Sequence, residues 1–365
     1  MHSRIRRALL CALTLALVVA PAVSAEAAQR KKKKPVDVTV MTRNIYLGGD
    51  IFAPLAAGDD RAEFERLAGL LWAEVQSTDF VGTRAELLAD EIRATKPDLI
   101  GLQEVAIWRR GPDGVKDGST TPATQVVFDW LKTFRAELRS QGLRYVVARK
   151  QQQADLETSI DAGYDVRLTQ HDVILVRKRK GLRVTKRLSE NYDTEIGVPT
   201  PVGTLTSKRG WTAVDVRLKG KRFRFVNTHL EAVGDDSGPR PAQARELIAR
   251  GGPLRGKRQL IVVGDFNSDP RGRESPSGAF DVLSGFGLVD TWPRRFGPGY
   301  SCCLTQSDAR DTNTDGFDHR IDLILAKPKL RAIRGRVVGD DLSDRAPNGL
   351  WPSDHAGVVT KLRLR

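Results

Sequence analysis

The sequence contains little cysteine, few aromatic residues and a single long apolar run. Three of its 365 residues are cysteine and 6% are aromatic. Cys11 lies inside the apolar run, which leaves Cys302 and Cys303, and adjacent cysteines cannot close a long loop. A framework of disulfides, such as stabilises many small secreted proteins, is therefore excluded. A strained disulfide within the pair and two free buried thiols both remain open.

Motifs of several enzyme classes are also missing. The chain has no G-x-S-x-G sequence, no Walker-type phosphate loop and no Cys/His cluster at the spacing of zinc ligands. These absences exclude hydrolases with a nucleophile elbow, P-loop nucleotidases and zinc-finger proteins. Beyond the N-terminal run, no segment is long and apolar enough to predict a transmembrane helix.

The N-terminus has the pattern of a secretory signal peptide. Three arginines lie within the first seven residues, the stretch from Ala8 to Ala20 carries no charge, and small residues follow Pro21. The apolar stretch is too short to span a bilayer easily. We therefore predict that residues 1–27 are a signal peptide and that the protein is secreted and extracellular.

The remaining chain is predicted to contain a basic leader and one domain. Residues 28–35 include the run from Lys31 to Lys34, which predicts a disordered leader that can contact a polyanion. No linker divides residues 36–365. The formal net charge of +14 favours anionic partners such as nucleic acid or anionic lipid, although a generally basic protein is an equally good interpretation. The oligomeric state is left open.

Hydrophobic periodicity predicts alternating strands and helices. Helical spacing occurs at 60–76, 83–94, 124–141 and 242–250. Apolar or alternating runs predict strands at 36–42, 98–102, 145–148, 172–177, 211–218, 222–228, 259–263, 321–325 and 358–364. Many strands with a few intervening helices are typical of a layered α/β fold.

Six short segments combine acidic, amide and imidazole side chains, and most of these polar residues lie at the end of an apolar run. The segments are 42–50 (TRNIYLGGD), 98–105 (DLIGLQEV), 226–232 (VNTHLEA), 261–270 (IVVGDFNSDP), 319–327 (HRIDLILAK) and 351–357 (WPSDHAG). Strand ends of a sheet deliver side chains to a common edge. Single Asp or His residues are common, whereas an ordered set of six segments is not, so we expect one shared site.

The acids and amides of these segments suit a hard cation and a phosphate. Carboxylate and carbonyl oxygens are preferred ligands of Mg²⁺, so Glu104 and Asn44 are candidate metal ligands. A solvated glutamate and a turn-forming asparagine are the plainer interpretations. Asp265 and Asn267 lie two residues apart on an extended segment, so their side chains point the same way. Together they can orient a water and hold a phosphate oxygen, unless they form an Asx-type turn.

Two of the four histidines after residue 27, His229 and His355, lie in these segments. Asp354 precedes His355 and is a candidate metal ligand. Asp322 is a candidate partner of the His355 imidazole, because a carboxylate fixes the tautomer of a histidine and raises its basicity. A surface ion pair with Arg320 is the alternative for Asp322.

In this order, the six segments resemble those of the endonuclease/exonuclease/phosphatase superfamily, which includes DNase I, exonuclease III and the bacterial sphingomyelinases. The resemblance extends from about Val36 to the C-terminus. It implies that residues 36–365 form a catalytic domain with the fold of that family. This fold is a four-layer α/β sandwich, in which two packed mixed β-sheets are flanked by helices.

The resemblance implies a divalent-metal site. Glu104 matches the principal Mg²⁺ ligand of the family, assisted by Asn44, and Mn²⁺ or Ca²⁺ are alternative ions. Asp354 matches an acid that lies near the metal. The implied reaction is in-line attack of water on a phosphodiester or phosphomonoester, with the metal neutralising charge that develops on the phosphoryl oxygens.

The resemblance also implies roles for the other candidates. Asp265 matches the residue that positions or deprotonates the attacking water, and Asn267 matches its phosphate-binding neighbour. His229 matches the histidine that contacts the scissile phosphate. Asp322 and His355 resemble the Asp–His pair of the family.

The sequence departs from the family in three places. Arg43 stands where many relatives have tryptophan, and the segment from Asn44 to Glu104 is long enough to hold an extra helix. The tyrosine and the acidic residue that the family usually has before the middle strand have no clear equivalent. The group that would brace His229 is therefore left open among the nearby residues Tyr164, Asp165, Arg167 and His171.

Several substrates fit the implied chemistry. A secreted nuclease is favoured, because a positive surface binds backbone phosphates, and we expect a basic groove lined by Arg109, Arg110, Arg167, Lys208 and Arg209. A sphingomyelinase-type phospholipase C is an alternative that requires an apolar surface element, for which Trp292 and the segment 296–300 are candidates. A small-molecule phosphatase is a further alternative.

A different class, a catalytically inactive surface protein that binds polyanions, also fits the charge. The complete set of acids and imidazoles argues against it, because an inactive relative is expected to have lost at least one of Glu104, Asp265 and His355.

Overall fold

The computed structural model describes residues 35–114, 122–234, 238–272 and 278–365. The predicted signal peptide and Lys31 to Lys34 of the predicted leader lie outside the described residues. Residues 35–365 form one compact unit. Within the part of the chain that is described, no helix is long and apolar enough to cross a membrane.

The first sheet is built around the first strand. β1 (Val36–Asn44) pairs parallel with β2 (Leu99–Pro112) and antiparallel with β15 (Gly357–Leu364). The strand order is β14–β15–β1–β2–β5–β4, and β3 pairs with β2. The further strands are β14 (Arg331–Val338), β5 (Tyr164–Arg177), β4 (Tyr145–Ile160) and β3 (Gln125–Asp129).

The second sheet contains the strands that lead into segments 226–232 and 261–270. β10 (Lys221–His229) and β11 (Gln259–Asp265) run parallel, and the order is β12–β13–β11–β10–β9–β6. Its other strands are β12 (Val289–Asp290), β13 (Asp322–Lys327), β9 (Gly210–Leu218) and β6 (Leu182–Asn191). β7 (Ile196–Thr200) and β8 (Gly203–Ser207) form a separate hairpin.

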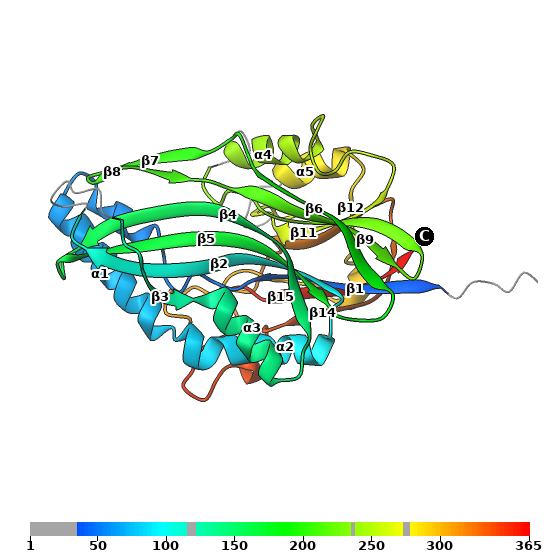
Figure 1. Cartoon of the computed structure of the whole chain (residues 1–365), viewed down its shortest axis with the longest axis horizontal. Helices are drawn as coiled ribbons and strands as arrows, with labels where there is room; N and C mark the ends of the chain where they lie inside the picture. The colour runs from blue at the N-terminus through cyan, green and yellow to red at the C-terminus, as the bar shows by residue number, and fades with distance from the viewer. Residues whose placement is uncertain (1–34, 115–121, 235–237, 273–277) are drawn as a thin grey trace, which may run out of the picture. The chain divides into compact units, whose positions relative to one another are not determined.

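Helices cover the outer faces of both sheets (Figure 1). α1 (Arg61–Ser77), α2 (Ala85–Thr95) and α3 (Trp130–Ser140) pack on the first sheet, and α4 (Pro239–Ile248) and α5 (Gly278–Gly285) pack on the second. Short helical turns are η1 (Ala53–Ala57), η2 (Phe80–Arg84), η3 (Arg294–Phe296) and η4 (Leu342–Asp344). This arrangement confirms the predicted four-layer α/β sandwich.

Three apolar cores lie between the four layers. Val38 and Val40 of β1 belong to the core between the sheets, whereas Met41 belongs to the core beneath α1, α2 and α3. A third core joins the second sheet to α4 and α5. Because alternate side chains of a strand point to opposite faces, a strand covered on both sides must be apolar on both. This explains the continuously apolar run from Ile261 to Val263, which has no exposed surface.

One predicted helix is partly wrong. The segment 124–141 contains β3 before the helix, and α3 begins only at Trp130. The Asp129 side chain accepts a hydrogen bond from the Lys132 amide at 2.9 Å, which caps the helix at this point. The strands predicted at 145–148 and 172–177 are the ends of the longer strands β4 and β5.

Candidate active site

The predicted site residues meet at one edge of the two sheets. In the strand registers, Asn44 lies opposite Gln103, His229 opposite Asp265, and Asp265 opposite Asp322. A pocket of about 280 Å³ is lined by six of the predicted residues, namely Glu104, His229, Asp265, Asn267, Asp354 and His355. Asn44 and Asp322 are fully buried and hydrogen-bond to members of this set. The structure therefore brings all eight residues together.

His355 and Asp322 form a buried hydrogen-bonded pair. The His355 Nδ1 group donates to Asp322 Oδ2 at 2.8 Å, and the backbone amide of Asp322 donates to Ser301 Oγ at 3.1 Å. Burial opposes protonation of His355, but the carboxylates of Asp322 and Asp354 outweigh it and raise the imidazole pKa well above its usual value. Nε2 faces Asp265 Oδ2 at 3.8 Å and the Asn44 amide nitrogen at 3.5 Å.

Asp265 lies at the centre of the site and contacts both histidines. Its Oδ2 atom accepts a hydrogen bond from Asn44 at 3.2 Å and lies 3.4 Å from His229 Nε2. Its Oδ1 atom accepts from the Asn267 amide at 2.9 Å, which is the Asx-type turn expected as the alternative. The turn and a role in the pocket are compatible, because this backbone bond fixes the Asp265 side chain at the rim, while the Asn267 side chain donates to the Leu230 carbonyl at 3.0 Å. Burial and the charge of Asp322 raise the pKa of Asp265 to about 6.

Glu104 reaches the pocket through a distortion of β2. Its φ of 61° and a register shift between Leu102 and Val105 interrupt the pairing with β5. A non-glycine residue in this conformation costs energy, and such residues gather at functional sites. The Glu104 Oε2 atom accepts a hydrogen bond from the Leu47 amide at 2.9 Å. Burial and the nearby Asp354 raise the pKa of Glu104 to about 7.

The donor set fits a hard divalent cation. Asp265, Asp322 and His355 offer ligand atoms within 4.8 Å of one another, but Asp322 Oδ2 and His355 Nδ1 already bond to each other. Glu104 and Asp354 line the same pocket, and the negative charge of Asp354 raises the cost of ionising Glu104. Buried carboxylates that repel one another are stabilised by a cation, and oxygen donors suit Mg²⁺, Mn²⁺ and Ca²⁺. We therefore keep Glu104, Asn44 and Asp354 as the predicted ligands.

Asp172 is a buried acid of the site that sequence reasoning missed. It lies on β5, its side chain is fully buried, and neither carboxylate oxygen has a hydrogen-bond partner among the described residues. Burial raises its pKa well above the usual value, and it interacts electrostatically with Arg209, Glu104 and Asp265. An unpaired buried carboxylate is costly, so its place beside the pocket indicates a functional role. A single acid within the apolar run HDVILV was the available signal.

Arg209 contacts His229 at Nδ1, the ring nitrogen that does not face Asp265. Its Nη1 atom lies 3.2 Å from His229 Nδ1, and its guanidinium pairs with the buried Glu231 at 3.4 Å. Burial and the charges of Arg209 and His355 lower the pKa of His229 well below its usual value, which keeps the imidazole neutral. Sequence reasoning placed Arg209 in an exposed groove, whereas its side chain is buried and lines the pocket.

The four residues considered as a brace for His229 have other partners. Tyr164 accepts a hydrogen bond from Trp72 at 2.9 Å, and Asp165 accepts one from Ser159 at 2.7 Å. Arg167 pairs with Asp155, and His171 Nδ1 donates to the Val105 carbonyl.

The predicted basic groove is not formed as expected. Arg167 is paired with Asp155 and Glu157, and Lys208 lies 3.7 Å from Glu195. Arg109 donates to Thr169, and Arg110 donates to Gln125. Among the five predicted residues, only Arg209 lines the pocket within the described part of the chain.

Arg43, one of the departures from the family pattern, lies outside the pocket and contacts the backbone of His355. Its side chain is buried, and it forms two hydrogen bonds with Glu91 of α2 at 2.7 and 2.9 Å. It also donates to the backbone carbonyl of His355. Burial raises the pKa of Glu91 even though Arg43 opposes this shift. Arg43 thus connects a helix to the backbone of the histidine.

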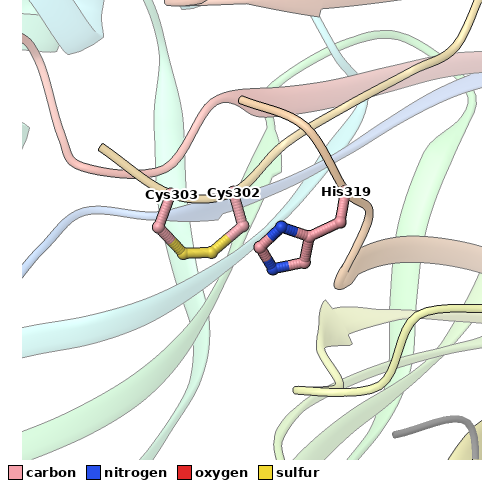
Figure 2. Close-up of side chains that lie close together, drawn as sticks. All are labelled: Cys302, Cys303 and His319. Atoms are coloured by element: carbon pink, nitrogen blue, oxygen red, sulfur yellow. A yellow bond between two sulfur atoms is a disulfide. The ribbon is translucent and has the colours of Figure 1, made fainter. Parts of the chain in front are cut away.

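Cys302 and Cys303 are joined by a disulfide in the structure, which is one of the two states left open by the sequence. Figure 2 shows the pair beside His319. Cys303 Sγ lies 3.7 Å from His355 Nε2, so the disulfide borders the site.

Comparisons with known proteins identify the family and the fold of the chain. The family model described as Endonuclease/Exonuclease/phosphatase family matches residues 75–355. An endonuclease/exonuclease/phosphatase from Bacteroides vulgatus has a TM-score of 0.53 and 20% identity, and covers 90% of this chain and 100% of its own. The mannosyl-6-phosphatase of Bacteroides thetaiotaomicron has a TM-score of 0.53 and 18% identity, with coverages of 89% and 99%.

A third solved structure, an endonuclease/exonuclease/phosphatase from Beutenbergia cavernae, has a TM-score of 0.53 and 21% identity. It covers 90% of this chain and 72% of its own. Among curated proteins there is no match. At these identities the structural likeness shows the fold.

Proposed function

We propose that this chain, which belongs to the endonuclease/exonuclease/phosphatase family, is a secreted phosphodiesterase that hydrolyses nucleic acid. Its family consists of divalent-metal-dependent phosphoric ester hydrolases. The observation that carries the proposal is the position of Asp265 between two histidines. The pKa of His229 is lowered, which favours the neutral imidazole, and the pKa of His355 is raised, which favours the charged one. Groups whose pKa values are pushed apart by their surroundings suit acid and base roles in one reaction.

Each side chain has a distinct task in the proposed reaction. Asp265 accepts the proton of the attacking water or orients it, because its carboxylate is held at the pocket by Asn44 and Asn267. The neutral His229 and the amide of Asn267 contact the phosphoryl oxygens. His355 carries a proton on Nε2 that is available to an oxygen of the phosphoryl group, while Asp322 holds the ring by Nδ1.

The predicted ligands of the metal are Glu104, Asn44 and Asp354. A bound Mg²⁺ or Mn²⁺ supplies Lewis acidity, which stabilises negative charge on the phosphoryl oxygens. Arg209 adds a fixed positive charge to the lining of the pocket, and its pairing with Glu231 keeps it in place.

The positive charge of the whole chain supports nucleic acid as substrate. The formal charge is +14, and loss of residues 1–27 removes three arginines and one glutamate, which leaves +12. Lysine and arginine side chains that neutralise backbone phosphates provide affinity without base contacts. The proposal therefore places general attraction on the surface and the chemistry in the pocket.

An apolar cavity favours a second candidate, an amphiphilic phosphoester such as a sphingolipid. A cavity of about 60 Å³ is lined mostly by apolar side chains, among them Leu55, Phe64, Trp72 and Trp108, and it shares Ile51 with the catalytic pocket. The neighbouring Phe52 is 37% exposed. Phe52, rather than Trp292, is the exposed apolar side chain at the pocket that this candidate requires, because Trp292 is 8% exposed and packs in the core between the sheets.

A panel of substrates tests the choice. We would assay supercoiled plasmid, single-stranded RNA, sphingomyelin vesicles and a sugar phosphate with Mg²⁺, using wild type and His355→Ala. The proposal expects metal-dependent nicking of the plasmid that is lost in the variant. Release of phosphocholine without nicking would identify a lipid as the substrate. Release of inorganic phosphate without nicking would identify a small phosphomonoester.

A further inference from the structure

The Cys302–Cys303 disulfide touches the histidine of the site. Cys303 Sγ lies 3.7 Å from His355 Nε2, the imidazole atom that faces Asp265. Cys302 is 1% exposed, and its backbone forms a β-bridge with His319. Figure 2 shows both cysteines and His319 side by side. The sulfur of Cys303 therefore forms part of the surroundings of His355.

The backbone around the disulfide also holds both members of the Asp322–His355 pair. The Ser301 carbonyl accepts from the Ala356 amide at 2.8 Å, and the Leu304 amide donates to the Asp354 carbonyl at 2.8 Å. On the other side, Ser301 Oγ accepts from the amides of Ile321 and Asp322. Segment 301–304 thus connects the backbones on either side of His355 to the start of β13.

A disulfide between neighbouring residues restricts this segment directly. It closes a small ring that includes the peptide between the two cysteines, so rotation about the backbone and side-chain bonds of Cys302 and Cys303 is limited. Two thiols lack this link and require van der Waals separation, which moves at least one sulfur. Because Cys303 contacts His355, such a movement changes the space available to the imidazole. The oxidised pair also leaves no thiolate that could join His319 as a metal ligand.

We propose that the Cys302–Cys303 disulfide is a positioning group for His355, and that the enzyme is fully active only while the disulfide is intact. The inference rests on the proposed phosphodiesterase function. In the controlling step an external dithiol gives two electrons and two protons to the S–S bond. The protein then carries two thiols, and the reductant becomes a disulfide.

The chain offers a clean test, because three cysteines are present and one of them, Cys11, lies in the predicted signal peptide. In a Cys11→Ser background, any effect of a reductant on the chain must act at Cys302 and Cys303. We would measure hydrolysis of bis(4-nitrophenyl) phosphate with Mg²⁺ before reduction with a phosphine, after it, and after reoxidation with oxidised glutathione. The Cys302→Ser/Cys303→Ser variant is the matched control, and mass spectrometry records the state of the pair.

Reduction is expected to lower kcat at least tenfold and to change KM less than twofold, and reoxidation is expected to restore kcat. The double-serine variant is expected to have the low kcat throughout and not to respond to either reagent. A disulfide that only stabilised the fold would change the melting temperature but not the kcat of the folded enzyme. Unchanged kcat on complete reduction, or two free thiols in the untreated protein, would overturn the proposal.

Hydrogen exchange separates this inference from the proposed function. Reduction is expected to accelerate exchange in peptides that contain the amides of Asp322 and Ala356, while peptides from α2 stay unchanged. If the oxidised enzyme cleaves no phosphodiester but these amides still respond, the proposed function fails and the positioning role stands. Unchanged exchange at both amides would contradict the positioning role whatever the activity.

Discussion

At the scale of single residues, the His355 imidazole is held from two sides. Nδ1 lies 2.8 Å from Asp322 and Nε2 lies 3.8 Å from Asp265, and the ring is buried. A carboxylate at Nδ1 keeps the proton on that atom and stabilises the charged imidazole. The position of the ring therefore depends on Asp322 more than on solvent.

We expect Asp322→Asn to lower kcat by two to four orders of magnitude, with a smaller change in KM. The amide keeps the shape of the side chain but removes the negative charge and permits the wrong tautomer, which costs about 10⁴ in kcat in a comparable triad. Steady-state kinetics on a phosphodiester would measure this. Asp290→Asn is the matched control, because Asp290 pairs with Arg320 away from the pocket. Equal effects of the two substitutions would contradict the assigned role.

His171 makes a separate prediction about pH. Burial, and then the charge of Lys150, lowers the pKa of this imidazole to about 4, whereas an unfolded histidine titrates near about 6.5. The unfolded chain therefore binds a proton at His171 more tightly than the folded chain does. The contribution of the neutral His171 to the free energy of unfolding is complete above about pH 6.5 and is lost as pH falls toward 4.

For His171→Gln we expect a shallower dependence of the unfolding free energy on pH between 6.5 and 4. The slope should fall by up to about 1.4 kcal/mol per pH unit. Urea unfolding at half-unit intervals of pH would measure it, and the slopes of the two proteins should coincide above pH 7. Parallel curves through the acid range would show that His171 does not titrate in this window.

The site residues differed in how far the sequence could predict them. Asp265 and His229 end the apolar runs of neighbouring parallel strands, so their meeting at one edge was predictable, and His355 lies in a short polar segment just before an apolar run. Asp172 escaped notice and Arg209 was expected on the surface, because the surroundings of both come from other strands and burial of a charge cannot be read from one segment. The roles of the predicted residues remain predictions, while their proximity is observed.

At the scale of elements, the parallel pair β10 and β11 positions the centre of the site. Gly264 precedes Asp265, and a Cβ atom added to it would lie 2.0 Å from the backbone oxygen of Thr228. The two strands can approach this closely only because Gly264 has no side chain. His229 and Asp265, the next residues on these strands, are brought to 3.4 Å by the same approach.

Gly264→Ala should therefore reduce both stability and activity. Forcing a methyl group into a packed strand pair costs about 1–3 kcal/mol, and displacement of Asp265 should lower kcat at least tenfold. Gly285→Ala is a suitable control, because an added Cβ meets no atom within 4 Å and the residue ends α5. Chemical denaturation and kinetics of both variants would decide. A Gly264→Ala enzyme with normal kcat would show that this close approach does not position Asp265.

Element prediction from sequence succeeded where periodicity was unambiguous. The strands at 211–218, 222–228 and 358–364 agree with β9, β10 and β15 to within two residues at each end. β3 was missed because its five residues continue an amphipathic pattern into α3. β7, β8 and β14 are short or carry exposed polar residues, so none of the three contains the apolar pattern from which a strand is predicted.

At the scale of the whole molecule, net charge and local site geometry have separate effects. The chain carries +14, yet most of the arginines predicted to line a groove are paired with acids or polar groups. Under the proposed function, attraction of a polyanion would come from the surface as a whole rather than from one basic groove. Such attraction acts over several ångströms and is weakened by salt.

The proposed substrate makes this charge measurable. Between about 50 and 200 mM salt, kcat/KM for DNA is expected to fall at least tenfold, because counterions compete with the protein for phosphates. The same change should affect hydrolysis of bis(4-nitrophenyl) phosphate less than about twofold, since one negative charge displaces few ions. Equal salt dependence for the two substrates would contradict nucleic acid as the substrate.

The most direct measurement of the central claim is the metal dependence of phosphodiester hydrolysis in wild type and Glu104→Gln. Both proteins would be freed of metal with a chelator and titrated with Mn²⁺, with Glu157→Gln as a control outside the pocket. The account predicts no turnover without metal, saturation in wild type and in the control, and at least a hundredfold higher metal requirement or no activity in Glu104→Gln. Turnover after complete chelation, or the same metal requirement in all three proteins, would contradict it.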